Sequence, residues 1–82
     1  MHILYILKSE KKEKYYVGQT NDMVDRFRRH NKGEVRSTRY GIPWKLVFVE
    51  KYKTRGEAMK RENFIKFKKS KKFIEKLIND AG

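Results

Sequence analysis

The stretch that decides the fold is Ile3-Leu4-Tyr5-Ile6-Leu7, which is followed, after a charged connection, by Tyr15-Tyr16-Val17-Gly18-Gln19. The first segment is apolar, too short for an amphipathic helix and rich in branched side chains, so it predicts a strand covered on both faces. The second segment predicts the returning strand of a hairpin. Gly18 within it indicates a bulge or the close approach of another group.

After the hairpin the sequence predicts a helix that begins near Thr20-Asn21-Asp22 and ends at Gly33. The polar side chains of Thr20-Asn21-Asp22 offer an N-cap, Asp22 and Asp25 put negative charge in the first turn, and a glycine readily adopts the left-handed conformation that ends a helix. Met23 and Phe27 lie one turn apart and predict a buried edge. Residues 34–43 show no period, and their arginines and hydroxyls predict a basic loop suited to backbone phosphates.

A third strand is predicted over Trp44-Lys45-Leu46-Val47-Phe48-Val49, with Trp44 in the core, and two helices follow it. Thr54 and Glu57 match the capping box, so the first of these helices should run from about residue 55 to residue 68 or 69. Ser70 should cap the last helix, which carries an apolar stripe. The order β-β-α-β-α-α predicts one α+β domain over residues 1–82, with helices flanking a small three-stranded antiparallel sheet.

The charge of the chain is strongly positive, with 22 Lys and Arg against 10 Asp and Glu and a net charge of +12. Such an excess is typical of proteins that bind nucleic acid, because cations that neutralise phosphates release condensed counterions. The absence of cysteine excludes disulfides and thiolate zinc sites. The first apolar run is too short for a signal peptide or a membrane span. We therefore expect a soluble cytoplasmic protein without a membrane partner, and association with the nucleoid would fit its charge.

Glu62 is the acidic residue whose predicted position suggests a functional role. It lies three or four residues from Ala58, Met59 and Ile65, which form the predicted buried stripe of the capped helix. A carboxylate on that face is costly unless it is paired or binds a metal. The alternative is a partly exposed ion pair with Lys66, one turn later.

Four further side chains could take part in chemistry, although each also has an ordinary structural explanation. Tyr5 and Tyr16 would be neighbours on the hairpin and could simply form a cross-strand aromatic pair. Arg26 and His30 lie one turn apart and would form a solvated helix edge in most proteins. The basic stretch over residues 66–72 likewise predicts a solvated face that attracts polyanions.

Taken together, these segments resemble the GIY-YIG nuclease superfamily over nearly the whole chain. Ile3-Leu4-Tyr5 stands at the first tyrosine motif and Tyr16-Val17-Gly18 at the second. Arg26 stands at the position of the catalytic arginine, His30 follows one turn later, and Arg61-Glu62 matches the segment that carries the metal-binding glutamate. The surrounding sequence is similar to the small stand-alone bacterial members.

The resemblance implies a metal-dependent endonuclease that hydrolyses phosphodiester bonds in DNA. Glu62 would hold Mg²⁺ or Mn²⁺, and Arg26 would neutralise charge on the scissile phosphate. Tyr16 is the preferred general base, with Tyr5 orienting the water or sharing that role. His30 would position the water or contact a phosphate. The residues expected to bind nucleic acid are Arg29, Arg36, Arg39, Tyr40, Lys66 and Lys69.

A domain of this size has room mainly for contacts to the nucleic-acid backbone. We therefore expect selection of branched, nicked or damaged DNA, as in repair or recombination, rather than of a base sequence. A protein partner could supply further specificity.

The chain departs from the family pattern at several positions. Ile3 and Leu4 replace the glycine and isoleucine of the first motif, and Val17 replaces the isoleucine of the second. Many members also use an asparagine downstream of the glutamate, whereas Asn63 and Asn79 stand at spacings that do not match. A catalytically weak or inactive nucleic-acid-binding module of the same fold therefore stays open, as does a structural ribosome-associated protein.

Overall fold

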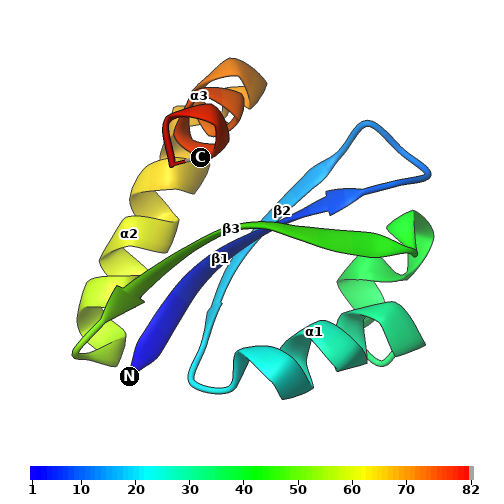
Figure 1. The fold of residues 1–82 in the computed structure, drawn as a ribbon, viewed down its shortest axis with the longest axis horizontal. Coiled ribbons are helices and arrows are strands. Elements are labelled where there is room, and N and C mark those ends of the chain that lie inside the picture. The colour runs from blue at the N-terminus through cyan, green and yellow to red at the C-terminus, as the bar shows by residue number, and fades with distance from the viewer. Residues whose placement is uncertain (82) are drawn as a thin grey trace.

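The computed structural model describes residues 1–81 and shows an antiparallel sheet with helices on both of its faces (Figure 1). In chain order the elements are β1 (His2–Ser9), β2 (Tyr15–Thr20), α1 (Met23–Lys32), the short 3₁₀ helix η1 (Arg36–Gly41), β3 (Trp44–Tyr52), α2 (Arg55–Lys68) and α3 (Lys71–Ala81). The predicted class and the predicted order of strands and α-helices are confirmed.

Strand β1 is the centre of the sheet, whose order is β2-β1-β3. Both of its neighbours pair with it in antiparallel fashion. Consecutive side chains of β1, from Leu4 to Leu7, are fully buried. Since successive residues of a strand point to opposite faces, this burial confirms that β1 is covered on both sides.

The two faces of the sheet carry two separate cores. On one face α2 and α3 cover a cluster formed by Leu4, Ile6, Val17, Phe48 and Ile65. On the other face α1 and the segment after it cover Tyr5, Leu7 and Trp44, as predicted for Trp44. Figure 1 shows the two helical layers lying on opposite sides of the twisted strands.

The helix ends follow the predicted capping chemistry. Asp22 accepts a hydrogen bond from a first-turn amide of α1, and Gly33 ends this helix with φ of 79°. Thr54 and Glu57 form the complete capping box at the start of α2. Ser70 Oγ accepts a hydrogen bond from a backbone amide in the first turn of α3. Local sequence therefore determines where each α-helix begins.

Two predictions about local structure were wrong. Met59 is 40% exposed, whereas Ala58 and Ile65 are buried. At about 100° per residue, Ala58 and Ile65 lie almost in line along α2, and Met59 lies about a quarter-turn away from them. The stretch expected to be a loop without regular structure contains η1, where Thr38 is fully buried. The Thr38 hydroxyl is therefore not available to phosphates.

Gly18 confirms the predicted close approach. It lies opposite Tyr5 in the β1–β2 register. A Cβ atom at residue 18 would lie 2.7 Å from the Tyr5 hydroxyl oxygen and 3.0 Å from Cε2 of Tyr16. The Tyr5 ring crosses β2 at this point, and only the absence of a side chain at residue 18 leaves room for it.

Replacing Gly18 with alanine is expected to lower the free energy of unfolding by about 1–3 kcal/mol, because the added methyl group overpacks a buried site. The matched control is Gly56→Ala on α2, where the nearest atom, Thr54 Oγ1, would lie 4.0 Å from the new Cβ. That variant should match or exceed wild-type stability. Chemical denaturation of both variants makes the comparison, and equal stabilities would contradict the packing argument.

Candidate functional site

The two tyrosines of the hairpin lie on the face of the sheet that α1 covers. The register pairs Leu7 with Tyr16 and Tyr5 with Gly18, so both tyrosines point to the same side. Their ring centroids are 6.2 Å apart. Tyr5 is fully buried, whereas Tyr16 is partly exposed. Of the two hydroxyls, that of Tyr16 is therefore the better placed to meet a substrate.

His30 joins the tyrosines from α1 in a buried hydrogen-bond chain. Its Nε2 atom lies 2.9 Å from the Tyr5 hydroxyl, and its Nδ1 atom lies 2.8 Å from Thr38 Oγ1. The Thr38 hydroxyl donates to the carbonyl oxygen of Val35 at 3.2 Å. Thr38 Oγ1 must then accept from Nδ1–H of His30, which leaves Nε2 to accept from the Tyr5 hydroxyl. The chain of donors thus requires a neutral histidine and a neutral tyrosine.

The electrostatics of this chain favour the same protonation states. Burial raises the pKa of Tyr5 to about 12, with Arg26 opposing the rise and Tyr16 and Glu62 adding to it. Burial, with Arg26 acting in the same direction, lowers the pKa of His30 to about 4. Tyr5 is therefore a hydrogen-bond donor at neutral pH and a poor candidate for a base. His30 has both ring nitrogens engaged and no exposed surface, so the predicted contact from His30 to a phosphate does not fit its position.

Arg26 lies on α1 beside both tyrosines. Its interaction with the Tyr5 hydroxyl raises the pKa of Arg26 against the effect of burial, and Tyr16 contributes in the same direction. Arg26 also lines a shallow groove that opens to solvent. The guanidinium therefore stays charged and can meet an anion that approaches the tyrosines.

Glu62 reaches the same region from α2. Its side chain is 18% exposed, and Oε2 accepts from Lys66 Nζ at 2.7 Å, which is the ion pair weighed as the alternative for this residue. Lys66 Nζ in turn lies 5.9 Å from the ring centroid of Tyr16. The carboxylate is close enough to Tyr5 to contribute to the rise in its pKa. Glu62 is thus part of the cluster and is also paired with the ammonium group of Lys66.

The residues expected to bind nucleic acid fall into two groups. Lys66 and Lys69 line one groove together with Tyr16. Arg29, Arg36, Arg39 and Tyr40 are exposed on α1 and η1. Within this second group Arg29 pairs with Asp25 at 2.8 Å, and Arg39 Nε donates to the Gly33 carbonyl oxygen at 2.6 Å. Part of this surface therefore also stabilises the junction between α1 and η1.

Two residues that the sequence did not mark as part of the site hold it in place. Thr38 lies in the segment whose hydroxyls were predicted to suit phosphates, but its hydroxyl instead orients His30. Asn31 fixes α1 to β3, because its Nδ2 donates to the Trp44 carbonyl oxygen at 3.0 Å and its Oδ1 accepts from the Trp44 amide at 2.6 Å. An asparagine beside the predicted catalytic helix face was the available signal. Its partner lies 13 residues away, and nothing local indicates it.

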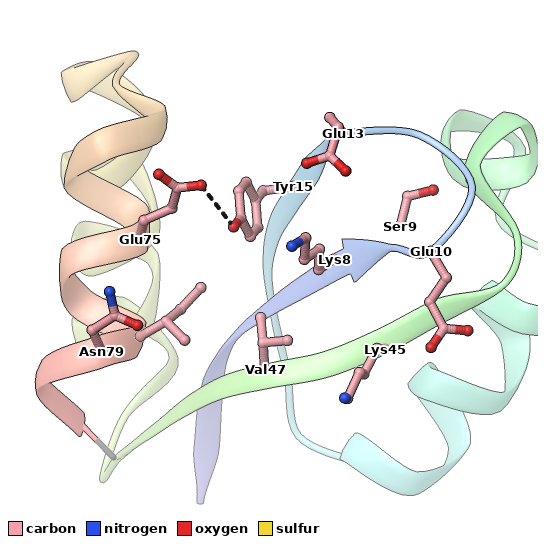
Figure 2. Close-up of a pocket in the computed structure, with 10 residues that line it drawn as sticks. Lys8, Ser9, Glu10, Glu13, Tyr15, Lys45, Val47, Glu75 and Asn79 are labelled. Atoms are coloured by element: carbon pink, nitrogen blue, oxygen red, sulfur yellow. Dashed lines mark hydrogen bonds between the residues drawn. The ribbon is translucent and has the colours of Figure 1, made fainter.

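A groove of about 630 Å³ on another part of the molecule is lined by none of the five predicted catalytic residues. It lies between the hairpin, β3 and α3, where Tyr15 donates to Glu75 Oε2 at 3.2 Å (Figure 2). Asn79 lines this groove, and Asn63 is exposed on α2 beside Glu62. Asn79 is thus placed away from the tyrosine cluster.

Within residues 1–81 no group of three or more His, Asp or Glu side chains could enclose a metal ion. Glu62 alone remains as a carboxylate ligand at the tyrosine cluster. A single carboxylate suits Mg²⁺, which keeps several waters and binds alongside substrate phosphates. The residues therefore fit a metal that a substrate helps to hold. Over the same residues, none of the helices combines the length and apolarity needed to cross a membrane.

The buried, neutral His30 predicts acid sensitivity. An unfolded chain binds a proton on histidine near pH 6.5, whereas the folded protein does so only near pH 4. The contribution of His30 to stability is therefore complete above pH 6.5 and falls as the pH drops towards 4. Through His30, the free energy of unfolding should fall by at most about 1.4 kcal/mol for each pH unit.

Chemical denaturation between pH 7 and 5 measures how the free energy of unfolding changes with pH. NMR of the His30 ring over the same range shows whether the ring takes up a proton. A ring that titrates near pH 6.5 would contradict the buried hydrogen-bond chain.

Comparisons with known proteins identify the family of this chain. Residues 1–77 match the GIY-YIG catalytic domain. The UPF0213 protein YazA of Bacillus subtilis is 35% identical over 82 residues, covering 95% of this chain and 82% of its own. A UPF0213 protein of Staphylococcus saprophyticus is 38% identical, covering 98% and 96% of the two chains, and one of Clostridium perfringens is 42% identical, covering 80% and 71%. No solved structure matches this chain. The sequence match and the tyrosine–histidine–arginine–glutamate cluster together show that the chain belongs to the GIY-YIG family.

Proposed function

We propose that this protein is a metal-dependent endonuclease that hydrolyses phosphodiester bonds in DNA and selects substrate structure rather than base sequence. Membership of the GIY-YIG family implies a nuclease and a nucleic-acid substrate. The observation that carries the finer proposal is the convergence of Tyr5, Tyr16, Arg26, His30 and Glu62 from β1, β2, α1 and α2 at one site. None of these elements brings more than two of the five side chains.

The cluster divides into a rigid part and a reactive part. Tyr5 and His30 are buried, neutral and hydrogen-bonded to each other, so they position their neighbours. Tyr16 packs on His30 with ring centroids 5.0 Å apart and keeps part of its surface exposed. It is the residue best placed to take a proton from the attacking water. Arg26 can stabilise the negative charge that develops on the phosphate.

Glu62 supplies the carboxylate for a divalent metal, which when bound stabilises charge on the scissile phosphate. Its pair with Lys66 is the observation that favours the second candidate, a binding module of the same fold with little or no turnover. In that case the ammonium would permanently occupy the position of the metal. The two candidates differ in cleavage and agree in binding.

Glu62→Gln is expected to lower the rate of cleavage by on the order of 100-fold or more, because it removes the metal-binding charge. Affinity for DNA should stay equal or increase, since the variant removes a negative charge from a cationic surface. Glu34→Gln is the control, because Glu34 is exposed beyond α1.

Cleavage of supercoiled plasmid, flap DNA and four-way junctions in Mg²⁺ or Mn²⁺ makes the comparison. Binding of every substrate by all three proteins, with cleavage by none of them, would establish the binding module instead.

Tyr16→Phe tests the assignment of the base. It should lower the cleavage rate by about 10²–10⁴-fold, the usual contribution of a general base, while leaving DNA affinity unchanged. Tyr15→Phe is the matched control, because Tyr15 is the adjacent residue and packs against the core on the opposite face of the sheet. Single-turnover kinetics measure the chemical step. A Tyr16→Phe variant as active as Tyr15→Phe would exclude Tyr16 as the base.

A further inference from the structure

Two shallow grooves flank the catalytic cluster along β2. One, of about 420 Å³, lies between β2 and the α2–α3 junction and is lined by Tyr16 and four lysines, among them Lys69. The other, of about 280 Å³, lies at the opposite end of the strand and is lined by Arg26 and Arg55 together with polar residues 19–21. Each groove shares one predicted catalytic residue with the cluster. The cluster therefore lies between two cationic depressions.

The cations in these grooves differ in how far the protein neutralises them. Lys66 is paired with Glu62, and Lys71 lies 3.6 Å from Glu13. Within the described part of the chain, Lys14 and Lys69 in the first groove and Arg26 and Arg55 in the second form no salt bridge. Arg26 belongs to the cluster itself and Lys14 precedes β2, so Lys69 and Arg55 are the cations without a salt bridge that the two ends of α2 present, one in each groove.

Lys69 occupies a backbone conformation that lysine rarely adopts. Its φ of 47° and ψ of 38° place it in the left-handed region at the end of α2. Within residues 1–81 it is the only residue other than glycine with positive φ. Glycine is the usual residue at such a helix end, and a residue with a Cβ there raises the free energy of the folded state. The negative end of the helix dipole favours the positive charge of Lys69, whereas the left-handed backbone disfavours any side chain with a Cβ at this position.

Arg55 is also disfavoured by its local structure. It is the first residue of α2, directly after the capping residue Thr54. The positive end of the helix dipole lies there, so a cation is repelled and an acidic side chain would be stabilised. Residues that break local rules are expected where function requires them. Lys69 and Arg55 each break such a rule, and each lines a groove beside the cluster.

We propose that the backbone of the substrate strand runs along β2, with Lys69 contacting phosphates on one side of the scissile bond and Arg55 contacting phosphates on the other. This inference rests on the proposed nuclease function. Arg55 and Lys69 stand at opposite ends of α2, so their backbones lie about 21 Å apart, which matches the axial rise of about six nucleotide steps of a B-form strand. A substrate must then extend in both directions from the cut, so the site is built for internal bonds rather than for ends.

The test measures binding of a short fluorescein-labelled DNA duplex by anisotropy in EDTA, over a range of salt concentrations. The variants are Lys69→Gly, Arg55→Gln and the double variant, with Lys76→Gln on the exposed side of α3 as the charge-matched control. Each lost phosphate contact lowers the slope of log K against log salt by about 0.9. We expect that reduction for each single variant, about twice that for the double variant, and none for the control.

Thermal unfolding of the same variants guards against loss of structure. Lys69→Gly relieves the left-handed lysine and Arg55→Gln removes repulsion from the helix dipole, so neither melting temperature should fall below that of the wild type. A lower melting temperature would contradict the local argument. A single-variant slope equal to that of Lys76→Gln would overturn the proposed path.

Because binding in EDTA needs no turnover, failure of the path and failure of the nuclease proposal can be told apart. Cleavage by the wild type together with insensitive slopes would refute the path alone. The expected slopes without cleavage in Mg²⁺ or Mn²⁺ would support the path and refute the nuclease.

Discussion

The contact between the Tyr5 hydroxyl and His30 Nε2, 2.9 Å long and fully buried, is the interaction on which the candidate site depends. It exists only because Gly18 leaves space for the Tyr5 ring to cross β2. It connects the central strand to α1 and fixes the face of α1 that carries Arg26. Thr38 continues the connection into η1, so one buried chain of hydrogen bonds orders three elements around the partly exposed Tyr16.

The protein separates neutral groups from charged ones. Tyr5, His30 and Thr38 are buried and neutral, since each hydrogen bond in their chain has a partner and burial disfavours charge. Arg26, Glu62 and Lys66 lie at the edge of this core, where water and substrate can reach them. Such an arrangement gives the reactive groups a rigid support without placing an uncompensated charge in the interior. The net charge of +12 then acts from the surface, where it can attract a polyanion.

Much of the fold could be predicted because its signals are local. The unbroken apolar run of β1, the capping box at Thr54 and the breaker Gly33 each involve residues that are neighbours in sequence, and all three are confirmed. The buried stripe of α2 was predicted correctly for Ala58 and Ile65 but not for Met59, because its spacing does not follow the helical period.

The candidate site was harder to predict, because its contacts are long-range. The five residues could be named from resemblance, and their roles stay predictions. The bond from Tyr5 to His30 spans 25 residues, and the role of Thr38 depends on a 3₁₀ helix that the aperiodic sequence did not indicate. The ion pair of Glu62 with Lys66 was foreseen as the alternative, whereas its position beside Tyr16 follows only from tertiary packing.

A crystal structure of the Glu62→Gln variant bound to a DNA fragment tests the central claim most directly. The account predicts a backbone phosphate in hydrogen-bonding contact with the Arg26 guanidinium and beside the Tyr16 hydroxyl, with His30 still buried behind Tyr5. DNA seated over the groove of Figure 2, with no phosphate near Arg26 or Tyr16, would contradict it.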